Sequence, residues 1–395
     1  MMSKTKYSFL NGFEFKSGLK VKNRIVIPPM TEASGFEDGS ITSDELRYFK
    51  IHSGGVGLFI SPVANVSENG KGFEGELSIT DDRFLPGLTK MASAMKQNGT
   101  KAVLQIFHAG RMSNSKILRG EQTVSASAVA AERPNAETPR ELTNDEIEQI
   151  ITDFGEATRR AIEAGFDGIE LHGANTYLLQ QFFSPHSNRR TDKWGGSVEK
   201  RMTFALEVIK TCHTMVEKYA DRPFLIGYRL SPEEIENPGI RMADTLQFID
   251  TLCNQPIDYL HISMGYAWRT SLNDESDTEP LILKIKRQVA GRLPLISVGS
   301  VEKPTDAQKV MDAGLDFVAL GREMLREPNW VQKVENNDEA AIRYTISTSD
   351  LDELGITPAM WNFLIVRLQS AMHVSNQPDY DKGLFNHKLA PHEGA

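Results

Sequence analysis

The chain has 395 residues and a formal net charge of -9 at pH 7. An acidic balance of this kind disfavours nucleic acid and anionic membranes as partners. No segment reaches the roughly 18–20 apolar residues that a membrane-spanning helix needs, and no leader-like run is recognisable near the start. We therefore expect a soluble cytoplasmic protein whose partners are small molecules.

The first half of the chain contains four of the short apolar segments that we expect to be strands. They are rich in Val, Ile, Leu and Phe and do not alternate with polar residues, as is typical of parallel strands covered on both faces. The same pattern continues to the end of the second half. The eight expected strands are residues 24–28, 57–61, 102–107, 168–172, 224–229, 259–263, 295–298 and 317–320.

Helical patterns separate these segments, and several carry clear start signals. Thr143 and Glu146 form a capping box before an apolar repeat, Ser197 can cap the next long helix, and Pro304 fits the first turn of another. Eight strands alternating with helices predict a (β/α)8 TIM barrel. The alternative, a doubly wound open sheet, lacks the Gly-x-Gly-x-x-Gly turn after its first strand.

The two ends of the chain extend beyond the barrel pattern. Residues 9–19, with turn residues at both ends, predict an N-terminal hairpin that could plug the bottom of the barrel. We expect residues 1–338 to form the barrel and residues 339–395 to form a C-terminal extension that is not an independent domain. Within it, Thr357 and Pro358 begin an apolar helix over about 358–371, followed by an extended tail. That helix could pack on the barrel or on a second subunit, which leaves a homo-oligomer open.

Distinctive side chains follow several of these strands, at the barrel end where active sites form. Small-residue loops follow the last two strands, and backbone N–H groups in such loops can approach a phosphate. An arginine there adds positive charge, so a phosphate site is favoured over two ordinary turns. The residues expected at this site are Gly299, Ser300, Gly321 and Arg322.

The fourth strand carries the most informative pattern. His172, Asn175 and Tyr177 lie within six residues at its end. Taken singly, each has an ordinary structural reading: a core histidine, a helix cap and a packing tyrosine. Together they supply groups that can polarise a carbonyl and deliver a proton. The two cysteines, Cys212 and Cys253, are too few and too far apart for a metal or iron–sulfur site, and we expect no metal.

The stretches 23–31, 104–111, 164–172, 187–197 and 321–328 resemble the old yellow enzyme family of flavin-dependent ene-reductases. The resemblance runs from about residue 10 to residue 333. It implies FMN as cofactor, with NADH or NADPH as reductant. It also implies that the flavin ring rests on Pro29, Met30 and Thr31, that Gln105 meets the flavin N3–H, and that Arg229 lies near N1. Residues 61–63 depart from the family pattern, and a flavin contact is expected there through the backbone of Val63.

The resemblance also implies roles for the fourth strand. His172 and Asn175 would donate to a substrate carbonyl or nitro oxygen, and Tyr177 would protonate the α-carbon of an electron-poor alkene after hydride transfer from flavin N5. The resulting hypothesis is an FMN-dependent NAD(P)H ene-reductase with ping-pong kinetics. The alternative is a broad flavin or quinone reductase. For Arg229, an interior salt bridge is a further reading, but the sequence does not identify the buried acid that it requires.

Overall fold

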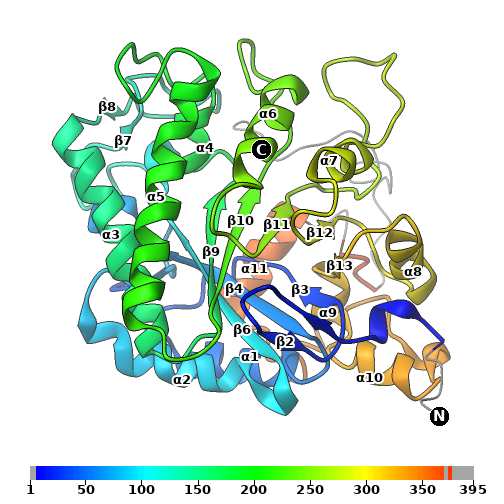
Figure 1. The fold of residues 1–395 in the computed structure, drawn as a ribbon. Coiled ribbons are helices and arrows are strands. Elements are labelled where there is room, and N and C mark those ends of the chain that lie inside the picture. The colour runs from blue at the N-terminus through cyan, green and yellow to red at the C-terminus, as the bar shows by residue number, and fades with distance from the viewer. Residues whose placement is uncertain (1–5, 369–371, 376–395) are drawn as a thin grey trace.

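The computed structural model describes residues 6–368 and 372–375. Its main sheet is a closed barrel of parallel strands, because β3 pairs with both β13 and β4. All eight strands expected from the sequence are confirmed, and helices surround them (Figure 1). The barrel strands are β3 (Ile25–Ile27), β4 (Leu58–Asn65), β6 (Lys101–Phe107), β9 (Gly168–Gly173), β10 (Leu225–Leu230), β11 (Tyr259–Ile262), β12 (Leu295–Val298) and β13 (Phe317–Ala319).

One helix follows each barrel strand on the outside, so that both faces of the sheet are covered. This arrangement explains the continuous apolar strands, every residue of which is buried except Lys101 at the start of β6. The outer helices are α1 (Ser43–His52), α2 (Leu85–Met95), α3 (Asn144–Glu163), α5 (Val198–Tyr219), α6 (Met242–Leu252), α7 (Leu281–Val289), α8 (Pro304–Asp312) and α10 (Trp330–Glu335).

The helix start signals act as expected. Thr143 accepts from the backbone N–H of Glu146, whose carboxylate accepts in return from the Thr143 N–H at 2.8 Å. Ser197 caps α5 in the same way through the N–H of Lys200, and Pro304 is the first residue of α8. These bonds satisfy N–H groups that have no partner within the helix.

The N-terminal hairpin is present, but its strands lie later than expected. β1 (Phe13–Glu14) pairs antiparallel with β2 (Lys20–Val21), whereas Phe9 belongs to a short 3-10 helix. The hairpin (dark blue, lower centre of Figure 1) inserts Phe15 into the barrel, where its ring stacks on Phe317 at 5.3 Å. The apolar side chains of the turn segment therefore fill one end of the barrel interior, as the sequence suggested.

The second strand is longer than expected, because it continues through Pro62 to Asn65. Proline has no N–H to donate, and the pairing with β6 changes register between Ile60 and Val63. The Ser61 hydroxyl accepts from the Gln105 N–H at 3.1 Å and thereby replaces a ladder bond. The extended end also pairs with β5 (Leu77–Ser78), a ninth strand that was not expected.

The C-terminal extension packs on the barrel over much of its described length. Ile346, Leu354, Ile356, Met360 and Leu364 join the main apolar core. The expected apolar helix is α11 (Pro358–Leu368), and the rest of that prediction, with the tail after residue 375, falls outside the described residues. The division into a barrel and a dependent extension remains a prediction.

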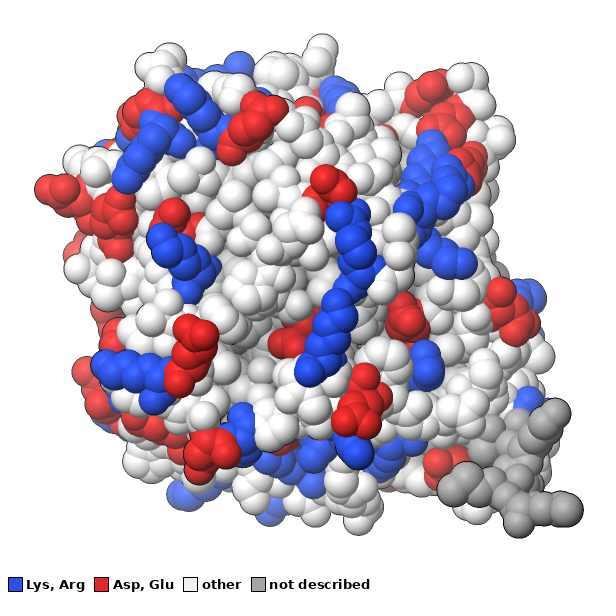
Figure 2. Space-filling view, in the orientation of Figure 1, with Lys and Arg blue, Asp and Glu red and all other residues white. Residues whose placement is uncertain are grey.

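Two observations bear on whether the protein could bind a membrane or a charged partner. In the part of the chain that the structure describes, none of the helices combines the length and the apolar character required to cross a membrane. On the face shown in Figure 2, Lys and Arg side chains are interspersed with Asp and Glu side chains.

Gly227 provides a test of the barrel packing. It lies opposite Tyr259 in the β10–β11 ladder, and a Cβ at this position would lie 2.1 Å from Cζ of the buried Tyr259 ring. Gly227→Ala should therefore lower the free energy of unfolding by about 1–3 kcal/mol, as overpacking does. Urea denaturation measures this value. The same substitution in a Tyr259→Leu background should cost clearly less, and an equal cost in both backgrounds would contradict the packing that we describe.

Candidate active site

Three of the expected site residues lie on adjacent strands at the same end of the barrel. Gln105 lies on β6, His172 on β9 and Arg229 on β10. The ladder pairs Arg229 with His172, and it pairs Gln105 with Glu170, two residues before His172. Since side chains two positions apart share a face of a strand, Glu170 and His172 both face the barrel interior.

An interior electrostatic role for Arg229 requires a buried acid, and the structure identifies Glu170 as that acid. Its side chain is fully buried, it accepts from Gln105 Nε2 at 2.7 Å, and it accepts from His261 Nδ1 at 3.0 Å. The period of two along β9 could have identified it, because His172 had already been assigned to the interior. An interior electrostatic partner for Arg229 therefore exists beside its expected cofactor role.

The charges of this cluster follow from burial and from one another. Burial, with the nearby Arg229 and His261, lowers the pKa of His172 well below its usual value, so His172 is neutral near pH 7. Burial likewise lowers the pKa of His261. Burial alone would raise the pKa of Glu170, but His261 and Arg229 hold it below its usual value. Burial lowers the pKa of Arg229, and Glu170 opposes that shift. The cluster is thus a carboxylate and a guanidinium among neutral imidazoles.

A strained turn follows β9 and presents the next expected residues. Asn175 and Thr176 have positive φ values of 55° and 66°, and this conformation is a real outlier for a β-branched threonine. The turn is held by Gln180 Oε1, which accepts from the Thr176 N–H at 3.0 Å, and by Gln181 Nε2, which donates to the Thr176 carbonyl at 2.7 Å. Both glutamines lie on α4 (Leu178–Phe183).

The side chain of Asn175 is oriented by a hydroxyl from another strand end. Ser263, just after β11, donates to Asn175 Oδ1 at 2.9 Å, and Ser231, after β10, accepts from the Asn175 N–H at 3.0 Å. With its oxygen engaged, the amide presents Nδ2 as a donor. Sequence reasoning did not single out either serine, although both lie directly at expected strand ends.

Tyr177 lies beside His172 and close to the second strand. Its ring meets His172 edge-on at 5.0 Å and Phe107 at 4.8 Å. Phe107 also packs with Val63, and Tyr177 lies against this small apolar cluster. The structure therefore brings Tyr177, His172 and Val63 into one region, although a cofactor contact at Val63 remains a prediction.

The four residues expected at a phosphate also come together. Arg322 Nη2 donates to Ser300 Oγ at 2.7 Å, and Ser300 donates to the Gly265 carbonyl at 2.9 Å. Burial lowers the pKa of Arg322 to about 10, so its side chain stays charged near pH 7. Gly299 has φ +129°, and a Cβ there would lie 2.6 Å from the Tyr266 nitrogen.

Gly321 connects this region to the loop after β3. A Cβ on Gly321 would lie 3.4 Å from Pro28 Cγ and 3.5 Å from Met30 Sδ, so the two loops are close neighbours. Pro29, Met30 and Thr31 are half-buried there. Their contacts with a flavin ring, and the role of Thr31 in particular, remain predictions.

Unsatisfied buried atoms show what kind of group fits this end of the barrel. Within the described part of the chain, Gln105 Oε1, Arg229 Nε and His172 Nδ1 are buried and lack a hydrogen-bond partner. A buried polar atom without a partner costs free energy, and such atoms gathered on three adjacent strands indicate a polar ligand edge. The Gln105 oxygen matches an imide N–H such as that of a flavin, and Arg229 matches a nearby carbonyl. The residues therefore fit FMN.

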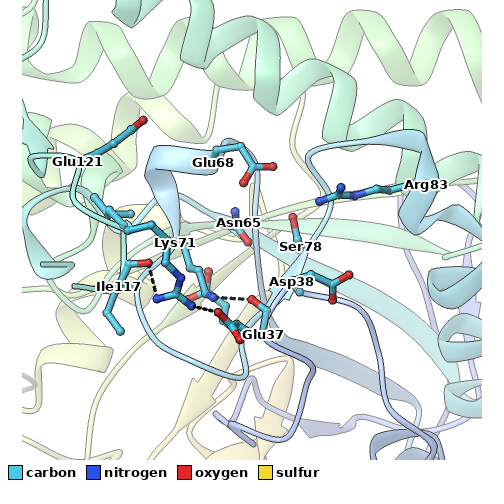
Figure 3. Close-up of a pocket in the computed structure, with 13 residues that line it drawn as sticks. Glu37, Asp38, Asn65, Glu68, Lys71, Ser78, Arg83, Ile117 and Glu121 are labelled. Atoms are coloured by element: carbon cyan, nitrogen blue, oxygen red, sulfur yellow. Dashed lines mark hydrogen bonds and ion pairs between the residues drawn. The ribbon is translucent and has the colours of Figure 1, made fainter. Parts of the chain in front are cut away.

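Two features nearby do not belong to this set. His108 is buried and bonded to Asn69 and to the Gly110 N–H, which favours a packing role in its loop. A hollow of about 480 Å³ opens beside the β4 end, and Figure 3 shows its mixed acidic and basic lining, which includes Glu37, Lys71 and Arg83. None of the expected site residues lines it. The described residues contain no group of three or more His, Cys, Asp or Glu that could hold a metal ion.

Comparison with known proteins identifies the family to which the chain belongs. Residues 10–340 match the family model described as the NADH:flavin oxidoreductase / NADH oxidase family. The NADH:acrylate oxidoreductase of Vibrio harveyi is 46% identical over 89% of the chain, which spans 35% of that protein. The probable NADH-dependent flavin oxidoreductase YqiG of Bacillus subtilis (strain 168) is 42% identical over 89% of the chain, which spans 94% of that protein.

A solved structure gives the same result. The old yellow enzyme homologue from Zymomonas mobilis superposes with a TM-score of 0.75 at 25% identity, and the match covers 90% of this chain and 98% of that one. The family resemblance and the barrel expected from the sequence are both confirmed. The chain belongs to the NADH:flavin oxidoreductase / NADH oxidase family, whose cofactor is FMN.

Proposed function

We propose that this protein is an FMN-dependent NAD(P)H oxidoreductase that reduces the C=C bond of α,β-unsaturated carbonyl or nitro compounds. The observation that carries the proposal is the placement of His172, Asn175 and Tyr177 at the end of β9, beside the unsatisfied buried atoms of Gln105 and Arg229. The name of the Vibrio relative points the same way, because acrylate is an α,β-unsaturated carboxylate.

In this proposal the chain holds FMN at two places. Gly299, Ser300, Gly321 and Arg322 receive its phosphate, and Gln105, Arg229, Val63 and the segment Pro29 to Thr31 meet its ring. When bound, FMN would supply the hydride chemistry that links NADH or NADPH to the β-carbon of the alkene. Glu170 fixes the Gln105 amide with Nε2 directed at the carboxylate, so that Oε1 remains as an acceptor for an N–H.

Substrate polarisation falls to two neutral donors. His172 is neutral because burial lowers its pKa, so it donates one hydrogen bond without bringing a full charge. Asn175 donates from Nδ2, since Ser263 engages its oxygen. Two fixed donors aimed at a carbonyl or nitro oxygen stabilise the negative charge that develops there as hydride reaches the β-carbon. Tyr177, held against His172 and Phe107, then gives its hydroxyl proton to the α-carbon.

The first test measures cofactor and acceptor together. We expect the purified protein to carry FMN, to oxidise NADH or NADPH, and to reduce 2-cyclohexenone and acrylate to their saturated products, followed by absorbance and by product analysis. A protein that carries FMN and reduces menadione but neither alkene would instead be the broad quinone reductase. A protein that binds no FMN would contradict both functions.

The second test isolates the proton donor. Tyr177→Phe removes the hydroxyl but keeps the ring contacts, so we expect alkene reduction to slow by about 100-fold or more, the usual contribution of a general acid. Oxidation of NADH by the bound cofactor should change only a few-fold. Stopped-flow absorbance separates the two half-reactions. The exposed Tyr219 on α5 offers a matched control, Tyr219→Phe, that should affect neither. Equal slowing of both half-reactions by Tyr177→Phe would remove its assigned role.

The third test concerns Glu170. Glu170→Gln removes the negative charge that opposes Arg229, so two-electron reduction of the cofactor, which adds negative charge, should become easier. We expect the FMN midpoint potential to rise by roughly 30–60 mV, equivalent to about 1.4–2.8 kcal/mol. Spectroelectrochemical titration measures it. Glu327 is also buried but bonds to Lys333 beyond the barrel, and Glu327→Gln should leave the potential unchanged. An unchanged or lower potential for Glu170→Gln would contradict the electrostatic role.

A further inference from the structure

Arg269 is a buried cation whose guanidinium has no hydrogen-bond partner in residues 6–368 and 372–375. Its side chain lies in the loop between β11 and α7 and is 1% exposed, yet Nε, Nη1 and Nη2 all lack a hydrogen-bond partner among the described residues. A guanidinium carries five N–H donors and stays charged in proteins. Burying such a group unpaired costs several kcal/mol in real proteins. An anion that accepted hydrogen bonds from these donors would offset that cost.

The neighbouring acid does not neutralise this charge directly. Burial lowers the pKa of Arg269 to about 10, and the negative charge of Glu233, which follows β10, opposes that shift. Both Glu233 oxygens are engaged, one by Ser271 Oγ and the other by the Leu272 N–H, each at 2.9 Å. Arg326 offers the contrast, because it is equally buried but paired with Glu302 at 2.8 Å and Glu323 at 2.7 Å.

The loop that carries Arg269 is fixed to both halves of the proposed site. At its start Ser263 donates to Asn175, on the substrate side. In its middle the Ala267 N–H donates to the Gly299 carbonyl at 3.0 Å, and the Gly265 carbonyl accepts from Ser300, on the phosphate side. The backbone of Arg269 itself is held, since it donates to Tyr266 and accepts from Leu281. The backbone that carries the guanidinium is therefore hydrogen-bonded to both sides of the proposed site.

We propose that Arg269 binds an anionic oxygen group of a reactant, a carboxylate or a phosphate, through its planar guanidinium. The inference deepens the proposed function, on which it rests, by naming an anionic class of reactant. Two sources carry this chemistry: the carboxylate of an unsaturated acid and the phosphates of the nicotinamide dinucleotide. In the proposed ping-pong reaction both reactants would use the same pocket in turn, and a guanidinium fork fits either group in a bidentate manner.

The experiment compares charged and uncharged members of each pair on the FMN-loaded protein. Acrylate is compared with acrylamide, and NADH with 1-benzyl-1,4-dihydronicotinamide, which has no phosphate. In Arg269→Met we expect the preference for the charged member, measured as a ratio of kcat/KM values, to fall by roughly 10- to 100-fold, as for loss of a charged hydrogen bond. Arg269→Lys, which keeps the charge but loses the fork, should fall between the two.

The outcomes show which reactant supplies the anionic group and whether Arg269 binds one at all. A fall confined to the acrylate ratio assigns the carboxylate, and a fall confined to the NADH ratio assigns the phosphates. Unchanged ratios in both pairs overturn the proposal. Since Arg269 is unpaired, Arg269→Met should not lower Tm, whereas Arg326→Met should, because it leaves buried carboxylates uncompensated. A wild-type protein that reduces none of acrylate, acrylamide and 2-cyclohexenone would refute the proposed function, while the NADH pair and the affinity for propanoate, read from the flavin absorbance, would still test Arg269.

Discussion

One buried carboxylate organises the functional end of this barrel. Glu170 lies without solvent contact among Gln105, His261 and Arg229, and each of these depends on its charge. A buried ion is tolerated only where hydrogen bonds and an opposite charge surround it. Because a carboxylate can only accept, it also determines which atom of each neighbour points at it. The orientation of the Gln105 amide and the tautomer of His261 both follow from this single acid.

Other residues of the site are also oriented by neighbouring side chains. Ser263 orients the Asn175 amide, and two glutamines on α4 hold the strained turn at Asn175 and Thr176. The residues assigned to chemistry are thus held by partners on other strand ends and helices. A barrel suits this arrangement, since every strand ends at the same rim and a partner is available from each side.

Much of this architecture could be predicted from the sequence, for reasons that lie in particular residues. Continuous apolar runs marked the eight strands, and Thr143, Ser197 and Pro304 marked helix starts, because their bonding is local. Long-range features were less accessible. The extension of β4 past Pro62 depends on a hydroxyl from Ser61 that replaces a ladder bond, and the hairpin places Phe15 in the barrel cluster while Phe9 joins the main core. Sequence reasoning gathered the site residues but missed Glu170, Ser263 and Arg269, whose significance depends on what lies beside them in space.

The hairpin plug has a consequence for how such a protein can change over evolutionary time. Phe15, Leu19 and Val21 fill the lower barrel as an apolar cluster separate from the main core and from the charged residues at the opposite rim. Packing in that lower layer does not involve His172, Asn175 or Arg269. Substitutions at the rim therefore leave the layer that closes the barrel intact, and new acceptor specificities can arise there without a new fold.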